Sequence, residues 1–252
     1  MRTAVATSNI VLGTAYLGVG FLILLDLKQG WHVFGFSRFG AGLAAVAFTC
    51  GAHHFVHGEH VAFRGQDAGR VDLLTVLVGL PFAATWLWLR LEALTGRPGE
   101  RFIPGTPPWV LALPNLAGVY VTVLVVAGFH VVHRSATFQV ALLPHVALVG
   151  VYLTIGWLLL RTQFVFHRES GGWSLSGCSF CGIFFTCAVM HAAIVLSGIG
   201  GREVVDVHGF LIALLGVPAG IYFLRVVREL VRAEASDWNV EAEEELSARR
   251  AA

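Results

Sequence analysis

The residues best suited to chemistry are two cysteine–histidine pairs with the same spacing. Cys50 lies four residues before His54, and Cys187 lies four residues before His191. Residues four apart share one face of an α-helix, so each pair would present a thiol and an imidazole together. Thiolate and imidazole ligands suit copper(I) or zinc. If the two helices meet, these side chains form a four-ligand site with two sulfur and two nitrogen donors.

Further histidines accompany these pairs. At 100° per residue, His57 shares the stripe of Cys50 and His54, and His53 and His60 lie beside it. The remaining candidate ligands on other segments are His130, His133, His145 and His208. Asp72 and Asp206 are expected to orient imidazoles as hydrogen-bond acceptors. Taken singly, His53 and His60 could equally face water or lipid headgroups, and His130 and His133 could cap a helix end.

The elements that carry these residues are predicted from charge. Only 13% of the 252 residues are charged, against about a quarter in soluble domains. A membrane-crossing helix needs roughly 17–25 apolar residues and satisfies its own backbone hydrogen bonds. Seven segments lack Asp, Glu, Lys and Arg: 3–25, 39–58, 73–89, 102–133, 135–160, 170–201 and 207–224. We therefore predict an all-α integral membrane protein with seven transmembrane helices in 1–232 and a polar tail in 233–252.

The distribution of Lys and Arg predicts the orientation. Five of the 17 fall at the N-terminus or after the second, fourth and sixth helices, and twelve fall on the opposite side. Cytoplasmic segments carry the excess of Lys and Arg, so we expect the N-terminus outside and the C-terminus in the cytoplasm of a plasma or inner membrane. Nine histidines then belong to the outer half, with His32 and His167 in cytoplasmic loops.

The chain also shows an internal repeat. Tyr16 and Tyr152 are 136 residues apart in similar apolar contexts, and Cys50 and Cys187 are 137 apart. Gly79-Leu80-Pro81 matches Gly216-Val217-Pro218, again at 137. We predict two parallel three-helix units, about 5–95 and 138–230, joined by a linker helix at 108–133. This 3+1+3 arrangement would have its two-fold axis along the membrane normal.

One segment resembles a known metal-binding helix. Phe48-Thr49-Cys50-Gly51-Ala52-His53-His54 is similar to the helix of ethylene receptors in which a cysteine and a histidine at this spacing hold copper(I). The resemblance implies copper ligation by Cys50 and His54. It covers one motif, and the copy at Cys187 and His191 lacks the Gly-Ala. The receptors also have fewer helices and a large cytoplasmic kinase-like part.

The preferred interpretation is a membrane copper protein acting in redox chemistry, in metal handling or as a subunit of a membrane complex. Oxidoreductase activity fits this chemistry, with the lipid bilayer, other membrane subunits or a redox partner as partners. A haem b protein with His54 and His191 as axial ligands is the main alternative, and zinc or iron could replace copper. A proton- or metal-coupled transporter is the third interpretation. No nucleic-acid motif is present, and Cys178 and Cys181 are expected to be small packing residues.

Overall fold

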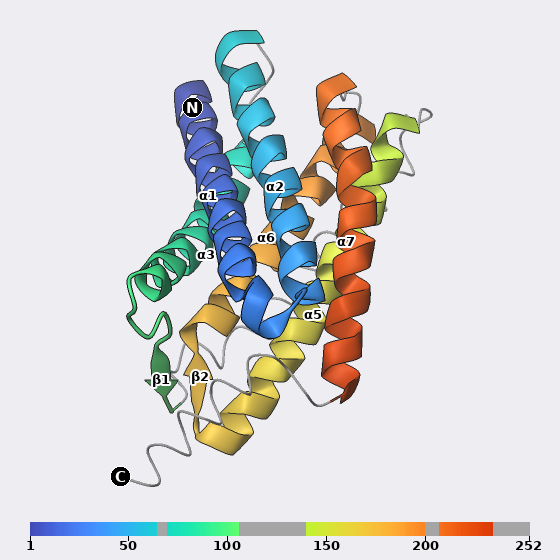
Figure 1. Cartoon of the computed structure of the whole chain (residues 1–252). Coiled ribbons are helices and arrows are strands. Elements are labelled where there is room, and N and C mark those ends of the chain that lie inside the picture. The colour runs from blue at the N-terminus through green and yellow to red at the C-terminus, as the bar shows by residue number, and fades with distance from the viewer. Residues whose placement is uncertain (65–69, 106–139, 200–206, 234–252) are drawn as a thin grey trace, which may run out of the picture.

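The protein is a helical bundle in a computed structural model that describes residues 1–64, 70–105, 140–199 and 207–233 (Figure 1). The helices are α1 (Arg2–Phe34), α2 (Arg38–Glu59), α3 (Arg70–Leu94), α5 (Leu143–Ser170), α6 (Leu175–Ile199) and α7 (Val207–Ala233). A π-helical turn, His60–Arg64, extends α2, and a 3₁₀ turn, Val140–Leu142, precedes α5. All six helices are long and apolar enough to cross a membrane. This confirms the prediction of an all-α protein with membrane-length helices.

Helices α1, α3, α5 and α7 run in one direction, and α2 and α6 run in the opposite direction (Figure 1). The ends of α2 and α6 and the starts of α1, α5 and α7 share the end of the bundle marked by the N-terminus (Figure 1). Helix α1 packs against α2 and α3, and α5 packs against α6 and α7. Contacts of α2 with α7, and of α3 with α6, join these two groups. The predicted linker helix at 108–133 and the tail after residue 233 lie outside the described residues.

Small residues bring α1 and α2 close together. A Cβ atom added to Gly13 would lie 2.8 Å from the backbone oxygen of Gly51, and one added to Gly51 would lie 3.0 Å from that of Gly13. Gly58 is similarly close to Ala6. Membrane helices associate through such close backbone approach because lipid provides no hydrophobic drive between them. The close contact fixes the height at which the histidines of α2 stand beside α1.

Two short strands lie at the other end of the bundle. Strand β1 (Phe102–Pro104) pairs antiparallel with β2 (Gly172–Ser174), with Ile103 opposite Trp173. His167, predicted to lie in a loop, belongs to the last turn of α5, and its ring stacks on Trp173 at 4.5 Å. The small sheet therefore joins the ends of α3 and α5 to the start of α6.

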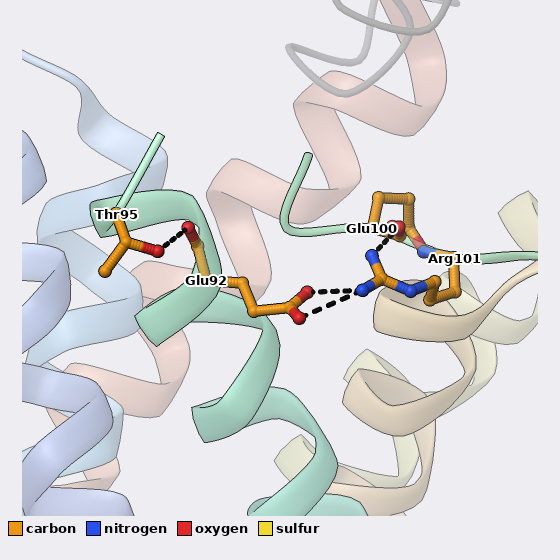
Figure 2. A network of polar contacts seen from close by, with 4 residues as sticks. All are labelled: Glu92, Thr95, Glu100 and Arg101. Atoms are coloured by element: carbon orange, nitrogen blue, oxygen red, sulfur yellow. Dashed lines mark hydrogen bonds and ion pairs between the residues drawn. The ribbon is translucent and has the colours of Figure 1, made fainter. Parts of the chain in front are cut away.

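A network of charged and hydroxyl groups reinforces this connection (Figure 2). The Arg101 guanidinium donates a hydrogen bond to Oε1 of the buried Glu92 at 2.9 Å and forms an ion pair with its Oε2 at 2.8 Å. The Glu100 carboxylate accepts from the Ser174 hydroxyl at 2.9 Å, from the Ser176 backbone N–H at 3.1 Å and from the Ser176 hydroxyl. Because the free N–H groups of a helix start attract negative charge, Glu100 stabilises the beginning of α6. We refer below to β1, β2 and this network as the clasp.

Candidate metal centre

Three histidines from three helices meet inside the bundle. His53 of α2, His145 of α5 and His191 of α6 each offer one ring nitrogen, and these nitrogens lie within 4.8 Å of one another. The side chains are 6%, 1% and 2% exposed, respectively. The ring centroid of His191 lies 5.0 Å from that of His145 and 5.1 Å from that of His53. The ring centroids of His53 and His145 are 5.4 Å apart. This three-histidine group could hold a metal ion.

Each histidine is held by a regular helix rather than by a loop. His145 lies in the first turn of α5, directly after Pro144, which suits an initial helical position because it needs no backbone donor. His53 lies in the second half of α2, and His191 in the second half of α6. Because α5 runs opposite to α2 and α6, its first turn and the second halves of α2 and α6 lie toward the same end of the bundle (Figure 1). Rigid elements of this kind set the ligand spacing well.

The hydrogen bonding of the group is incomplete. His145 Nδ1 and His191 Nδ1 are 2.8 Å apart, so one nitrogen donates and the other accepts if both rings are neutral. His53 Nδ1 and His145 Nε2 are buried without a hydrogen-bond partner among the described residues. An unsatisfied buried polar atom costs about 1–3 kcal/mol. A cation bound by His53 Nδ1 would use a lone pair that the protein itself leaves unpaired.

One pair of nitrogens is already close to the spacing of a metal site, and all three lie within 4.8 Å of one another. Metal–imidazole bonds of about 2.0–2.1 Å in tetrahedral geometry separate two ligand nitrogens by about 3.3 Å. The 2.8 Å between His145 and His191 would therefore widen by roughly 0.5 Å on binding. Three imidazoles also leave a fourth coordination position for water or another ligand.

A second polar cluster lies beside the three histidines. The thiols of Cys50 and Cys187 interact with each other, and both are free and buried. The Tyr152 hydroxyl lies 3.2 Å from Cys50 Sγ, and Cys187 Sγ donates to the Tyr16 hydroxyl at 3.5 Å. The Tyr152 ring also contacts the His191 ring, with centroids 5.6 Å apart. We call Tyr16, Cys50, Tyr152 and Cys187 the thiol–tyrosine cluster.

The four ligands predicted from the cysteine–histidine pairs take separate positions. Cys50 and Cys187 interact with each other, and His191 belongs to the three-histidine group. His54 Nδ1 bonds to Asn9 Oδ1 at 2.8 Å, and the His54 ring contacts the Tyr16 ring at 5.5 Å. Within the described part of the chain, the group of potential ligands contains no cysteine. Ligation by the two sulfurs and two imidazoles stays a prediction.

The remaining predicted ligands surround this centre or lie outside the described residues. His53 and His60 are buried, so the alternative in which they face water or headgroups is wrong. The His60 ring lies 6.0 Å from that of the exposed His208, and His60 Nε2 is 3.2 Å from Glu59. Of the others, His57 and Asp72 are half-buried, and His130, His133 and Asp206 lie outside the described residues.

Asn9 is the functional candidate that the sequence reasoning missed. It is fully buried, donates through Nδ2 to the Val5 carbonyl at 3.0 Å and uses Oδ1 for His54. A signal was available, because Asn9 and His145 are 136 residues apart, the same offset that relates Tyr16 to Tyr152. Each half of the chain therefore pairs one buried histidine with one polar side chain from the preceding helix.

Comparisons of this chain with protein-family models, with curated proteins and with solved structures found no match. The functional assignment therefore depends on the chemistry of the residues themselves. The evidence consists of the membrane-length helices, the buried three-histidine group and the adjoining thiol–tyrosine cluster.

Proposed function

We propose that the protein is an integral membrane copper protein whose ion is held by His53, His145 and His191. One observation carries this proposal: three fully or almost fully buried imidazoles converge, and two of their nitrogens have no hydrogen-bond partner among the described residues. Neutral imidazoles are good ligands for copper, zinc, iron and nickel. Ionisable groups inside a membrane protein are costly and mark functional sites.

Copper is favoured by affinity and by the neighbourhood of the site. Nitrogen sites bind Cu²⁺ more tightly than the other divalent first-row metals. The thiol–tyrosine cluster adds side chains that can lose electrons, and Tyr152 contacts both Cys50 and His191. Zinc has no redox chemistry and would leave these neighbours without a role. Redox chemistry or redox-linked metal handling is therefore the proposed activity.

Haem b with His54 and His191 as axial ligands is the alternative. A porphyrin would have to lie between two imidazoles on opposite sides of the iron, with ring centroids more than about 6 Å apart. The rings of His54 and His191 instead pack on Tyr16 and Tyr152 at 5.5 and 5.6 Å. These direct contacts favour a single ion over a macrocycle.

We further propose the two-fold repeat of the bundle. Three pairs of contacts support it, in which the residues of one contact lie 136 or 137 residues from those of the other. The counterparts are Tyr16–Cys187 with Tyr152–Cys50, Asn9–His54 with His145–His191, and Gly79 beside Thr186 with Gly216 beside Thr49. The contact of α2 with α7 likewise corresponds to that of α6 with α3. His53 corresponds to Met190, so this symmetry yields one three-histidine group and not two.

Seven helices and the orientation belong to the same proposal. Helix α3 ends near the clasp, whereas α5 begins at the end that bears the N-terminus (Figure 1). A crossing by the intervening segment 106–139 would account for these positions. The Lys and Arg distribution favours an external N-terminus in a plasma or inner membrane, with the metal group in the outer half and lipid around the bundle.

Metal analysis and a visible spectrum of the full-length protein in lipid nanodiscs test the function. We expect about one copper per chain and no Soret band, as follows from a three-imidazole site. His53→Leu should lower the copper content at least tenfold, while the control His208→Ala, at an exposed position of the same end, should keep it. A Soret band, stoichiometric zinc without copper, or full copper in His53→Leu would overturn the proposal.

A further inference from the structure

Cys50 and Cys187 lie outside the three-histidine group. Cys50 is 4% and Cys187 2% exposed, and both belong to the main apolar core. They come from different helices, α2 and α6, and both sulfurs belong to the thiol–tyrosine cluster, where Cys50 Sγ lies 3.2 Å from the Tyr152 hydroxyl and Cys187 Sγ lies 3.5 Å from the Tyr16 hydroxyl. The two thiols interact with each other, and oxidation of such a pair yields a disulfide.

The surroundings favour an uncharged redox change. A thiolate or another lone charge is costly in an apolar interior. Oxidation of two thiols to a disulfide removes two electrons and two protons, so the pair is neutral before and after. The buried dithiol can thus deliver electrons without leaving a charge in the membrane interior.

One side chain connects the pair to the metal group. The Tyr152 hydroxyl lies 3.2 Å from Cys50 Sγ, and the Tyr152 ring packs on His191. An electron leaving Cys50 therefore has a single aromatic residue between the sulfur and a metal ligand. The same hydroxyl can share the unpaired electron with Cys50 after the first of two one-electron steps.

We propose that Cys50 and Cys187 are the internal reductant of the three-histidine site, converting bound Cu(II) to Cu(I). This inference rests on the proposed function. Two Cu(II) ions, bound one after the other, each accept one electron. The S–H bonds of Cys50 and Cys187 break, one S–S bond forms, and two protons pass to solvent with two Cu(I) ions as product. The ligand class is thus a cupric ion, and the released species is cuprous.

Anaerobic titration of the reduced, metal-free full chain in nanodiscs with Cu(II) tests this. Electron paramagnetic resonance follows Cu(II), a Cu(I)-specific chelator counts the product, and mass spectrometry of the Cys50 and Cys187 peptides detects the disulfide. We expect about two Cu(II) reduced per chain, as the two-electron oxidation of a dithiol requires. The signal of bound Cu(II) should persist in Cys50→Ser and in Cys187→Ser.

Cys178→Ser is the matched control, since this cysteine lies on α6 away from the pair, and it should behave like the wild type. Tyr152→Phe should slow the reduction at least tenfold without changing its final extent. The inference is overturned if wild-type protein keeps bound Cu(II) unreduced, or if Cys50→Ser and Cys187→Ser reduce it as the wild type does. Failure of the proposed function looks different, because no variant would then bind copper. The Cu(II) signal of each cysteine variant also reports that its site has folded.

Discussion

Replacing His145 by asparagine should separate metal binding from folding. The pair His54–Asn9 shows that an imidazole and a carboxamide fit between buried helices at a 2.8 Å hydrogen bond. His145 and His191 form the corresponding pair, also at 2.8 Å. His145→Asn therefore installs in the second half the arrangement that the first half already has. We expect the hydrogen bond to His191 to survive and the third metal ligand to be lost.

The loss of copper affinity and the loss of stability should differ in size. Removing a group that only orients a metal ligand weakens binding about 10–100-fold, so losing the ligand itself should weaken it by more than about 100-fold, or about 2.8 kcal/mol. The stability cost of His145→Asn should stay below about 1 kcal/mol because one hydrogen bond is exchanged for another. His145→Ala instead leaves His191 Nδ1 unsatisfied and opens a cavity, which together should cost about 2–4 kcal/mol.

The assay combines two measurements on full-length protein in the same detergent or nanodisc. Competition with a copper chelator gives the dissociation constant, and thermal unfolding followed by circular dichroism gives stability without metal. The expected order of stability is wild type, His145→Asn and then, well below, His145→Ala. Copper binding within tenfold of wild type in His145→Asn would refute the ligand assignment, and equal destabilisation by both variants would refute the predicted pairing.

Three other outcomes can be checked. Arg101→Leu should lower stability by about 2 kcal/mol because it leaves the Glu92 carboxylate buried without its cation, and thermal unfolding would show no change if the clasp were unimportant. Gly13→Ala should lower the unfolding temperature, since the added Cβ meets a backbone oxygen of α2 at 2.8 Å. Gly150→Ala has open space around its Cβ and should leave the unfolding temperature equal or higher. The reverse order of unfolding temperatures would contradict the close packing of α1 on α2. A C-terminal green fluorescent protein fusion should fluoresce and a C-terminal alkaline phosphatase fusion should be inactive, and an active phosphatase would invert the proposed orientation.

Hydropathy predicted the helices better than their ends. Six of the seven uncharged segments contain or largely overlap a described membrane-length helix. Helix α5, however, continues through Arg161 and Arg168 to Ser170, because a helix does not stop where its charged residues leave the apolar layer. The strands β1 and β2 could not be predicted, because three residues are too few to show the alternation of apolar and polar side chains that is typical of a strand. Their pairing of Phe102 with Ser174 is set by the fold and not by neighbouring residues.

The residue types of the candidate site were predictable, but their grouping was not. The helical surface puts His53 and His54 about 100° apart, and both are buried because α2 has protein neighbours on both sides. His54 faces Asn9 of α1, whereas His53 faces His145 and His191. Which imidazole meets which depends on the order of the helices around the bundle, which no spacing within one helix can specify. The interaction of Cys50 with Cys187 agrees with the proposed repeat, in which the two residues are 137 positions apart.

The clasp has a consequence for how a metal ion reaches its ligands. It fixes α3, α5 and α6 to one another at one end, and His145 lies 25 residues before the end of α5, or about 38 Å at 1.5 Å per residue. With the clasped end as the pivot, a tilt of α5 by about 1° displaces His145 by roughly 0.5 Å, the widening that a tetrahedral ion needs. Because α5 is long and fixed at one end, a very small change of its angle is enough to widen the hydrogen-bonded pair of His145 and His191 to the spacing of two metal ligands.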